Sequence, residues 1–264
     1  MLMAVKNQFK CSFMAIKYGL MKEMLNRASF ISNVVFMILN NASMLIQWAV
    51  LYSLKDNIGG YTFKEVMLLW GIAASTYGLS RGFFSSAFKL SDTINKGKLD
   101  AFLVQPKSVL LNAITTHVEA SAFGDLIFGL AMVFFYGFSV QTLLLFIFFT
   151  ITGGLILVAI AVILGSLAFF MSNSDIISDS GNNLMIHFAT YPDGIFKGVV
   201  KGLLFTLIPV GIANYLPLQV IISFDIVKFL IIIGVTLFFI LFAVLVFNLG
   251  LKKYSSTNLM NARI

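Results

Sequence analysis

Long apolar runs divide the chain into segments close to the ~20 residues that a helix needs to cross a bilayer. Five runs are clear and predict spans at about 30–53, 63–86, 113–138, 142–171 and 226–249. The fourth run has no charged residue in thirty positions, so we expect it to tilt or to project beyond the bilayer. The pattern predicts an all-α, polytopic membrane protein.

The region between the fourth run and the last one allows two interpretations. Hydropathy alone makes 198–221 the fifth span and leaves 172–197 as a polar loop. The alternative makes the polar helix 175–194 the fifth span. Both versions give six crossings and place the two termini on the same side of the membrane.

The second version requires two further features. Residues 198–217 would form a short re-entrant element on the outer side, bent at Pro209 and closed by Pro217. Polar groups at membrane depth are tolerated only inside protein or beside a water-filled cavity. Residues 175–194 would therefore have to lie at an interface.

The first segment of the chain, 5–27, has an amphipathic pattern. Its apolar residues recur at three- or four-residue steps, as on one face of a helix: Val5, Phe9, Phe13, Ile16, Leu20 and Met24. Lysines that can meet anionic headgroups flank this stripe: Lys6, Lys10 and Lys17. We expect an interfacial helix that lies along the membrane surface in contact with lipid, and the alternative is a soluble helix packed on a partner.

Composition supports a membrane environment. Hydrophobic residues make up 59% of the 264 residues and charged residues only 11%, against about 25% charged in soluble domains. The net charge of +7 does not indicate a nucleic-acid partner, because the cations cluster at the ends of the spans. The single cysteine, Cys11, excludes a disulfide framework and a multi-cysteine metal site, and we expect no metal and no cofactor.

The distribution of Lys and Arg predicts the orientation. Thirteen of these residues fall on one side: Lys6, Lys10, Lys17, Lys22, Arg27, Arg81, Lys89, Lys96, Lys98, Lys107, Lys252, Lys253 and Arg263. Five fall on the other: Lys55, Lys64, Lys197, Lys201 and Lys228. The positive-inside rule then places both termini in the cytoplasm. The chain shows no internal repeat and no linker, so 1–264 is expected to be a single transmembrane domain.

Ionisable residues inside a membrane are functional candidates, because burying one unpaired costs about 2.5–3.5 kcal/mol. Glu119 and Asp125 are such acids, with His117 nearby. Six positions in one helix rotate the two acids about 240° apart, so a shared proton site is not expected. Instead we expect Glu119 near the cytoplasmic boundary and Asp125 bonded to another helix. Arg81 is expected to extend its side chain to the cytoplasmic boundary.

Polar residues of the segment 175–194 are candidates for a path. Asp175, Asp179, Asn182 and Asn183 are spaced to share one helix face. With His187 they would line a translocation path at a dimer interface, or else belong to a solvated loop. In the fourth run Gly153, Gly154 and Gly165 are expected to allow close helix approach.

The polar segment 88–112 is expected on the cytoplasmic side. Gly97 and Pro106 are expected to mark the ends of its central part, and its apolar ridge consists of Ile94, Leu99, Phe102 and Leu103. Such a segment can dock into a groove on another subunit or pack on its own bundle. The chain lacks the G-x-x-x-x-G-K-[ST] motif for ATP, so energy would come from a partner or an ion gradient.

Four motifs together resemble the type-2 ABC exporter permeases. Ile94–Pro106, INKGKLDAFLVQP, is similar to their G-x-L-(D/E)-x-L-L-x-x-P signature, and Gly124–Asp125 also fits. Tyr191–Pro217 resembles a YP-x-x-I-F … P-V-(A/G) … Y-x-P segment of one bacterial subfamily, and Leu249–Ser256 its G-L-x-R-Y-(S/T)-S tail. Residues 175–183 are more polar than the family's fifth span.

The resemblance implies a fold, partners and site residues. It implies the second version of the fifth span, followed by outer re-entrant helices, in a bacterial plasma membrane. A separate ABC ATPase and a second permease subunit, identical or paralogous, would be the partners. The residues that couple to the ATPase would be Ile94, Gly97, Leu99, Asp100, Phe102, Leu103 and Pro106.

The predicted function is therefore export of a substrate from the cytoplasm, driven by ATP that the partner hydrolyses. The chain itself would not be an enzyme. The substrate would be a hydrophobic or cationic small molecule, a lipid or a peptide. The alternative is an ATPase-independent carrier or a membrane-embedded enzyme, which would need acids or histidines that converge at membrane depth.

Overall fold

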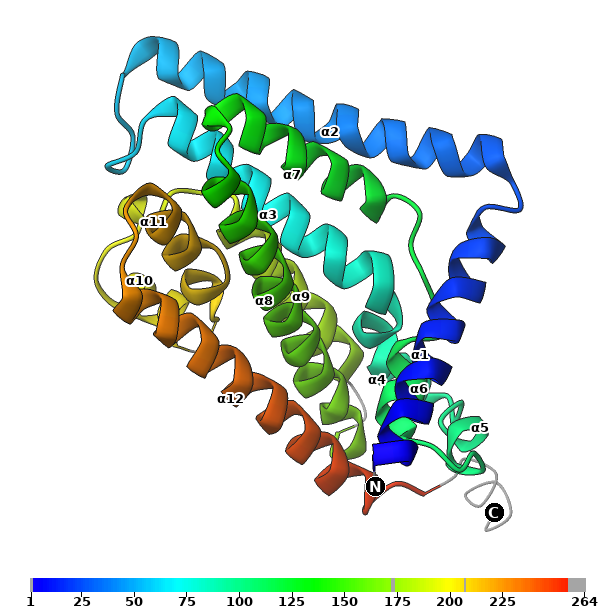
Figure 1. Cartoon of the computed structure of the whole chain (residues 1–264). Helices are drawn as coiled ribbons and strands as arrows, with labels where there is room; N and C mark the ends of the chain where they lie inside the picture. Colours follow the sequence, from blue (N-terminus) through cyan, green and yellow to red (C-terminus); the bar gives the residue numbers. More distant parts are fainter. Residues whose placement is uncertain (1, 172–173, 207, 256–264) are drawn as a thin grey trace.

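The computed structural model describes residues 2–171, 174–206 and 208–255, and this part of the chain is helical apart from turns and one isolated bridge between Ile58 and Tyr61 (Figure 1). Expectations for Ser256, for Arg263 and for the side chain of Val5 fall outside what is described. The helices are α1 Leu2–Glu23, α2 Arg27–Leu54, α3 Phe63–Phe84, η1 Ser85–Lys89, α4 Leu90–Asn95, α5 Asp100–Leu103, α6 Val109–Ile114, α7 Ala122–Gly137, α8 Val140–Gly165, η2 Ser166–Phe169, α9 Ser174–Ala189, η3 Asp193–Ile195, α10 Gly198–Phe205, η4 Gly211–Tyr215, α11 Leu216–Ile222 and α12 Ile226–Leu251.

Three of the described helices are long and apolar enough to cross a bilayer: α2, α8 together with η2, and α12. They match the first, fourth and last predicted spans. Helix α3 has 22 residues, about 33 Å at 1.5 Å per residue, but it is less apolar. Helices α7 and α9 have 16 residues each. The chain is thus a multi-pass membrane protein, and its full set of six crossings stays a prediction.

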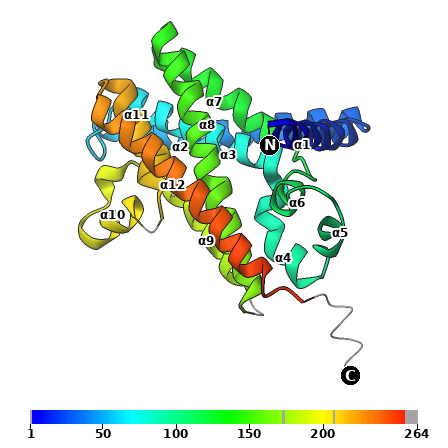
Figure 2. The ribbon, with the colours of Figure 1, turned by 60° about the horizontal axis from the view of Figure 1, so that its bottom comes forward.

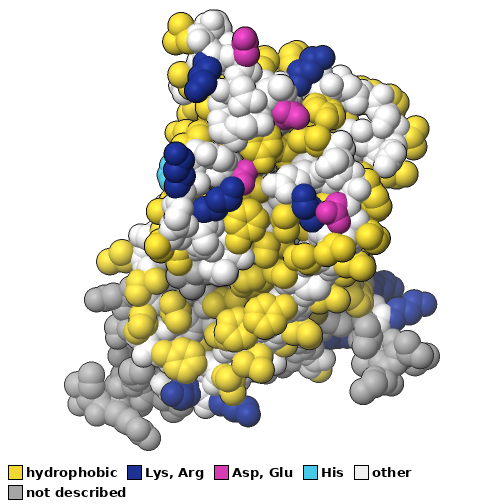
Figure 3. Space-filling model, turned by 90° about the vertical axis from the view of Figure 1, so that its left-hand side faces the viewer, with side chains coloured by type: hydrophobic (Ala, Val, Ile, Leu, Met, Phe, Trp, Pro, Cys, Tyr) yellow, Lys and Arg dark blue, Asp and Glu magenta, His cyan; other side chains and the backbone are white. Residues whose placement is uncertain are grey.

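The short helices gather at two opposite ends of the bundle. Helices α10 and α11 lie at one end, whereas α4, α5 and α6 lie at the other, where α12 also ends (Figures 1 and 2). Viewed from the side on which α10 and α11 lie, cationic and acidic side chains are interspersed over the upper half of the surface, and apolar side chains dominate below (Figure 3).

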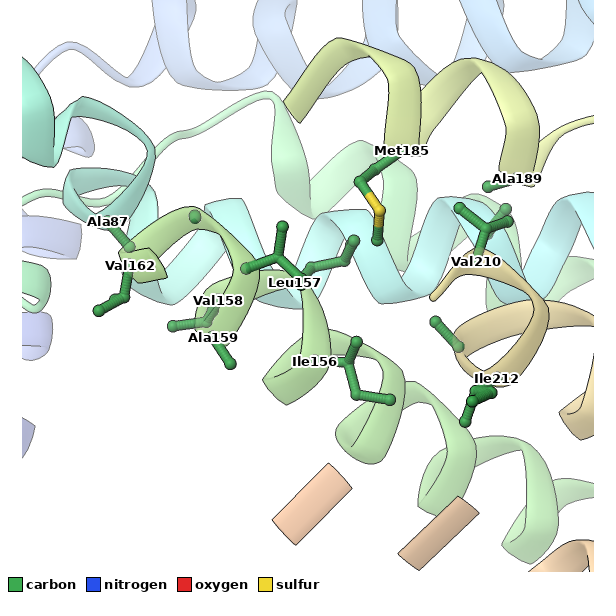
Figure 4. Close-up of a cluster of buried hydrophobic side chains, with 14 of the residues drawn as sticks. Ala87, Ile156, Leu157, Val158, Ala159, Val162, Met185, Ala189, Val210 and Ile212 are labelled. Carbon is green, nitrogen blue, oxygen red and sulfur yellow. The ribbon is translucent and has the colours of Figure 1, made fainter. Parts of the chain in front are cut away.

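Helix α8 is the centre of the bundle. In its most apolar stretch 61% of the residues are buried, against 17% in α2 and in α12. Figure 4 shows Met185 and Ala189 pointing from α9 toward the buried cluster that includes Leu157 of α8 and Val210. Helices α2 and α12 therefore present most of their apolar surface outward, as lipid-facing helices do.

Glycines allow the close approach of helices to α8, as predicted. A Cβ at Gly153 would lie 2.9 Å from the side chain of Thr76 in α3, and one at Gly154 would lie 2.6 Å from Leu79. A Cβ at Gly165 would lie 2.8 Å from Leu90 of α4. Small residues at such contacts let helix backbones pack closely.

The prediction that 113–138 is one continuous span is wrong. Helix α6 ends at Ile114 and α7 begins only at Ala122. In the link, the hydroxyl of Thr115 donates to the carbonyl of Leu111 at 2.7 Å, and that of Thr116 to Ala113 at 3.2 Å. Hydroxyl groups that bond to nearby backbone compete with the helix, so the chain turns here.

The interpretation of 198–221 as a single span is also wrong. The segment is divided into α10, η4 and α11, and the polar stretch before it forms the helix α9. Pro209 precedes η4, as expected for a bend, but Pro217 lies in the first turn of α11 and does not close the element. A proline is tolerated there because the first turn leaves its N–H groups unbonded. The element extends to Ile222.

Helix α1 forms where the amphipathic pattern predicts a helix, but it ends at Glu23 rather than at residue 27. Phe9 and Phe13 are exposed on it. The side chain of Gln8 fixes α1 to its own bundle, because its Nε2 donates to Asn112 at 3.1 Å and its Oε1 accepts from the backbone of Ser108 at 2.9 Å.

Candidate functional site

A cavity of about 450 Å³ lies among α2, α3, α7, α8 and α9. Its volume is in the range of about 300–1,000 Å³ that is typical of small-molecule sites. The chain's two tryptophans both line it. The lining residues are Met37, Asn40, Asn41, Met44, Gln47, Trp48, Leu51, Trp70, Ala73, Ala74, Tyr77, Asp125, Leu157, Met185, Ile186, His187, Ala189, Thr190, Tyr191 and Asn214.

Asp125 is the single carboxylate among these lining residues, and it is 4% exposed. The Asn41 amide donates to its Oδ1 at 2.6 Å, and the indole of Trp70 donates to the Oδ1 of Asn41 at 3.1 Å. Among the described residues, the second carboxylate oxygen, Oδ2, has no hydrogen-bond partner. Three helices thus meet in one polar chain beside the cavity.

Gly124 is the reason why Asp125 can reach α2. A Cβ at Gly124 would lie 2.5 Å from the carbonyl oxygen of Val34 and 2.8 Å from the side chain of Met37, both in α2. On the other side, Gly78 of α3 lies against Asp125 itself: a Cβ at Gly78 would lie 3.0 Å from the Cβ of Asp125. The Gly124–Asp125 pair therefore lets α2 approach α7 and then bonds the two helices.

Glu119 lies apart from this cavity, in the non-helical link before α7. The 240° separation from Asp125 assumed a continuous helix and does not apply. Arg81 pairs with Glu119 at 3.3 Å, and its guanidinium lies 5.1 Å and 5.0 Å from the ring centres of Tyr77 and Phe88. Arg81 is thus held between an acid and two aromatic rings and does not simply extend to a boundary.

The polar residues predicted for the path are divided between two faces of α9. Asn182 is buried together with Ser178 and Met185, so it does not share a face with Asp179 and Asn183 as the spacing argument proposed. Asp179, Asn183 and His187 are exposed at four-residue steps. Of the predicted path residues, His187 alone lines the cavity.

The predicted coupling segment is not one helix. Helix α4 ends at Asn95, Gly97 has a positive φ of 67°, and the four-residue α5 follows. Positive φ favours glycine because it has no Cβ. Ile94 and Leu99 are buried in the chain's own core, so the predicted exposed ridge does not include them.

The outward surface of the segment comes after the turn. Leu103 is 43% exposed and Val104 is 83% exposed. Phe102 is half-buried against the core, and Pro106 is exposed. The hydroxyl of Tyr254 donates to Asp100 at 2.8 Å, which ties the segment to the end of α12.

Charged residues brace the turn before α5. Asp92 pairs with Lys96 at 2.5 Å and with Lys98 at 3.4 Å. The hydrogen bond from Lys96 is the main reason why the pKa of the Asp92 carboxyl is below its usual value, and Lys98 lowers it further. The side chain of Asn95 donates to Asp175 at 3.1 Å, which joins α4 to α9.

A second polar cluster, at the α10–α11 end, was not predicted. The hydroxyl of Tyr61 donates to Asp193 Oδ1 at 2.6 Å, and Lys201 pairs with Asp193 Oδ2 at 2.8 Å. Burial and the Asp193 carboxylate raise the pKa of Tyr61. The sequence signal for this cluster is the aspartate of the Tyr-Pro-Asp-Gly stretch, which the family resemblance includes as part of a motif.

Among the described residues, no group of three His, Cys, Asp or Glu side chains is placed to hold a metal ion.

Comparison with known families gives a match. The family model described as "ABC-2 family transporter protein" matches residues 38–258, which include the coupling segment and every residue that lines the cavity except Met37. Neither the curated proteins nor the solved structures give a significant match. Members of this family are generally transport subunits in the membrane, which normally work with an ABC ATPase. The chain therefore belongs to the ABC-2 family of transporter proteins.

Proposed function

We propose that the chain is the transmembrane half of an ABC exporter in a bacterial plasma membrane. A separate ATPase subunit hydrolyses ATP, and the substrate, a hydrophobic or cationic small molecule, a lipid or a peptide, leaves the cytoplasm. Two such subunits, identical or paralogous, face each other. Both termini lie in the cytoplasm, as the distribution of cations indicates. On this side α1 lies along the lipid, and α10 and α11 form the re-entrant element on the other.

The observation that carries this proposal is that residues 94–106 contain both buried residues that anchor the segment and exposed apolar residues. Leu99 is fully buried and Asp100 is bonded to Tyr254, so the segment is fixed to the bundle. Leu103 and Val104 are exposed beside these anchors. Leu103 and Val104 thus form an exposed apolar knob on a firmly held turn. Such a knob is suited to insertion into a groove of another subunit.

The anchors also supply a route for force. Leu90 of α4 packs on Gly165 at the end of α8, and Asn95 bonds to Asp175 at the start of α9. Displacement of the segment by the ATPase would therefore move α8, α9 and α12 together. Packed elements transmit displacement because protein interiors are close-packed.

The exposed polar stripe of α9 supports a path between two permease subunits. Asp179, Asn183 and His187 share one face, and polar side chains at membrane depth need protein or water beside them. A second subunit facing α9 would provide both. Helix α9 would then be the fifth crossing.

Loss of the ATPase on mutation of the exposed knob tests the proposal. The double variant Leu103→Asp, Val104→Asp keeps the buried anchors and puts two carboxylates on the docking surface. We expect the amount of ATPase that co-purifies with the chain to fall by at least about tenfold, as for the loss of an interface hot spot. Val199→Asp, Val200→Asp, at exposed positions of α10, is the matched control. Full ATPase recovery with the first variant would contradict the coupling role.

A further inference from the structure

The cavity beside Asp125 combines one buried acid with an aromatic wall. Trp48, Trp70, Tyr77 and Tyr191 line it. Its lining residues include the imidazole of His187 but no Lys and no Arg. The nearby guanidinium of Arg81 is paired with Glu119 instead.

The hydrogen bonds of Asp125 are incomplete. A carboxylate has two oxygens that each accept hydrogen bonds, and Asn41 satisfies only Oδ1. Oδ2 is buried and has no partner among the described residues. Leaving a buried charged acceptor unpaired is costly. A hydrogen-bond donor or a cation that binds in the cavity would therefore supply the partner that the protein does not provide for Asp125.

The chemistry of the wall selects among ligands. An anion would be repelled by Asp125, and a neutral apolar molecule would leave Oδ2 unpaired. A cation can pair with the Asp125 carboxylate, and the ring of Trp70, whose indole bonds to Asn41 in the same polar chain, can attract the same positive charge. The volume of about 450 Å³ suits a drug-sized molecule rather than a folded peptide.

We propose that this cavity, within one subunit, binds a monocationic aromatic small molecule whose charge pairs with Asp125. The inference narrows the substrate class of the proposed exporter. It rests on the proposed function for the transport step, but not for binding. Asp125 determines specificity for charge, and the tryptophans hold the apolar part of the ligand.

Binding of a matched pair of probes tests the inference. N-methyl-4-phenylpyridinium is a cation, and 4-methylbiphenyl is its neutral isostere. We expect equilibrium dialysis of the full chain in neutral detergent to show binding of the cation at least about tenfold tighter than that of the isostere, with detergent-only controls for partitioning. Asp125→Asn should abolish this preference. Asp56→Asn, which also removes one carboxylate but at an exposed loop position, should keep it.

The position of the bound cation has a direct reporter, because both tryptophans line the cavity. A pyridinium quenches indole fluorescence at short range, so saturable quenching should accompany binding and disappear in Asp125→Asn. Equal affinity of Asp125→Asn for the cation, or equal affinity of the wild type for both probes, would overturn the inference.

A second measurement keeps the test decisive if Asp125→Asn fails to fold. In a Cys11→Ser background, Ala74→Cys places a thiol on the cavity wall, with Asp125 intact. The cation should slow its reaction with methyl methanethiosulfonate, whereas the isostere should not. Equal protection by both probes, or none by the cation, would overturn the inference. Co-purification of the ATPase is independent of these results, so failure of the ligand assignment is distinguishable from failure of the exporter assignment.

Discussion

Tyr254 donates its hydroxyl hydrogen to Asp100 across 154 positions of sequence, at 2.8 Å. The bond joins the tail after α12 to the coupling segment. These are the first and the last of the four motifs that resemble the permease family. The ring of Tyr254 also meets Phe169 of η2 edge-on, with centroids 6.0 Å apart. One side chain thus connects the coupling segment with the ends of α8 and α12.

Removing only the hydroxyl, in Tyr254→Phe, should weaken this connection and keep the ring packing. We expect the chain to fold with its unfolding free energy reduced by about 1–2 kcal/mol, and ATP-driven transport to fall severalfold. Thermal unfolding in detergent and transport in proteoliposomes measure the two effects. Tyr18→Phe, at an exposed position of α1, is the control. Wild-type values for both quantities would contradict the role of the bond.

The difference in unfolding free energy between wild type and Tyr254→Phe depends on pH through the titration of Tyr254. Burial and the Asp100 carboxylate raise the pKa of Tyr254 to about 12. Because the folded-state pKa is above the ~10 of a free tyrosine, the contribution is fully present below about pH 10 and is lost as pH rises toward 12. The stability difference between wild type and Tyr254→Phe should therefore stay constant from about pH 6 to 9. A difference that vanishes within that window would exclude this bond as its cause.

Close approach of α2 and α7 at Gly124 can be tested with one methyl group. Gly124→Ala forces atoms against Val34 and Met37, and overpacking of this kind costs about 1–3 kcal/mol. It should also lengthen the Asn41–Asp125 contact and reduce cation binding. In α12 a Cβ at Gly234 would meet nothing within 4 Å, so Gly234→Ala should be neutral or slightly stabilising. Equal effects of the two substitutions on thermal unfolding would contradict the packing argument.

The pair Tyr61 and Asp193 should behave as a coupled unit at the α10–α11 end. In a double-mutant cycle with Tyr61→Phe and Asp193→Asn, we expect a coupling energy of about 0.5–3 kcal/mol, because the two side chains share a partly buried hydrogen bond. Tyr61→Phe combined with Glu23→Gln, in α1, should be additive. Additivity within the first pair, measured by thermal unfolding, would show that the bond does not contribute.

The sequence was sufficient for the elements whose surfaces are uniformly apolar. Helices α2, α8 and α12 follow the predicted runs within a few residues because their ends are marked by polar residues. The polar helix α9 required the family resemblance, since hydropathy favours 198–221. The break after Ile114 was missed because side-chain hydroxyls, rather than a proline or a charge, end the helix.

Of the residues that line the cavity, sequence reasoning identified only Asp125 and His187 as candidates, and it did not predict their arrangement. Asp125 was identified as an acid in the membrane, yet its partner Asn41 lies 84 positions away, and no periodicity links the two. In the coupling segment, Leu99 and Leu103 were both predicted to belong to an apolar ridge, but sequence does not distinguish the core-facing Leu99 from the exposed Leu103. Val104, which is more exposed still, was not predicted. The difference depends on tertiary packing, which includes the tail whose Tyr254 bonds to Asp100.

The orientation has a test in the natural sequence, because Cys11 is the chain's single cysteine and is exposed. A membrane-impermeant maleimide should label it in inverted vesicles and not in intact cells. Gly202→Cys in a Cys11→Ser background, at an exposed position of α10, should show the reverse. Labelling of Cys11 in intact cells would invert the predicted topology.

Contact between residue 104 and an ATPase in living cells is the most direct test of the proposed function. With a photo-crosslinking amino acid at position 104, irradiation should give one principal adduct, and mass spectrometry should identify its partner as an ABC ATPase. The same amino acid at position 199 should give no such adduct. If position 104 crosslinks only to lipid, while position 199 or no position captures the ATPase, then residues 94–106 are not the surface through which ATP drives this protein.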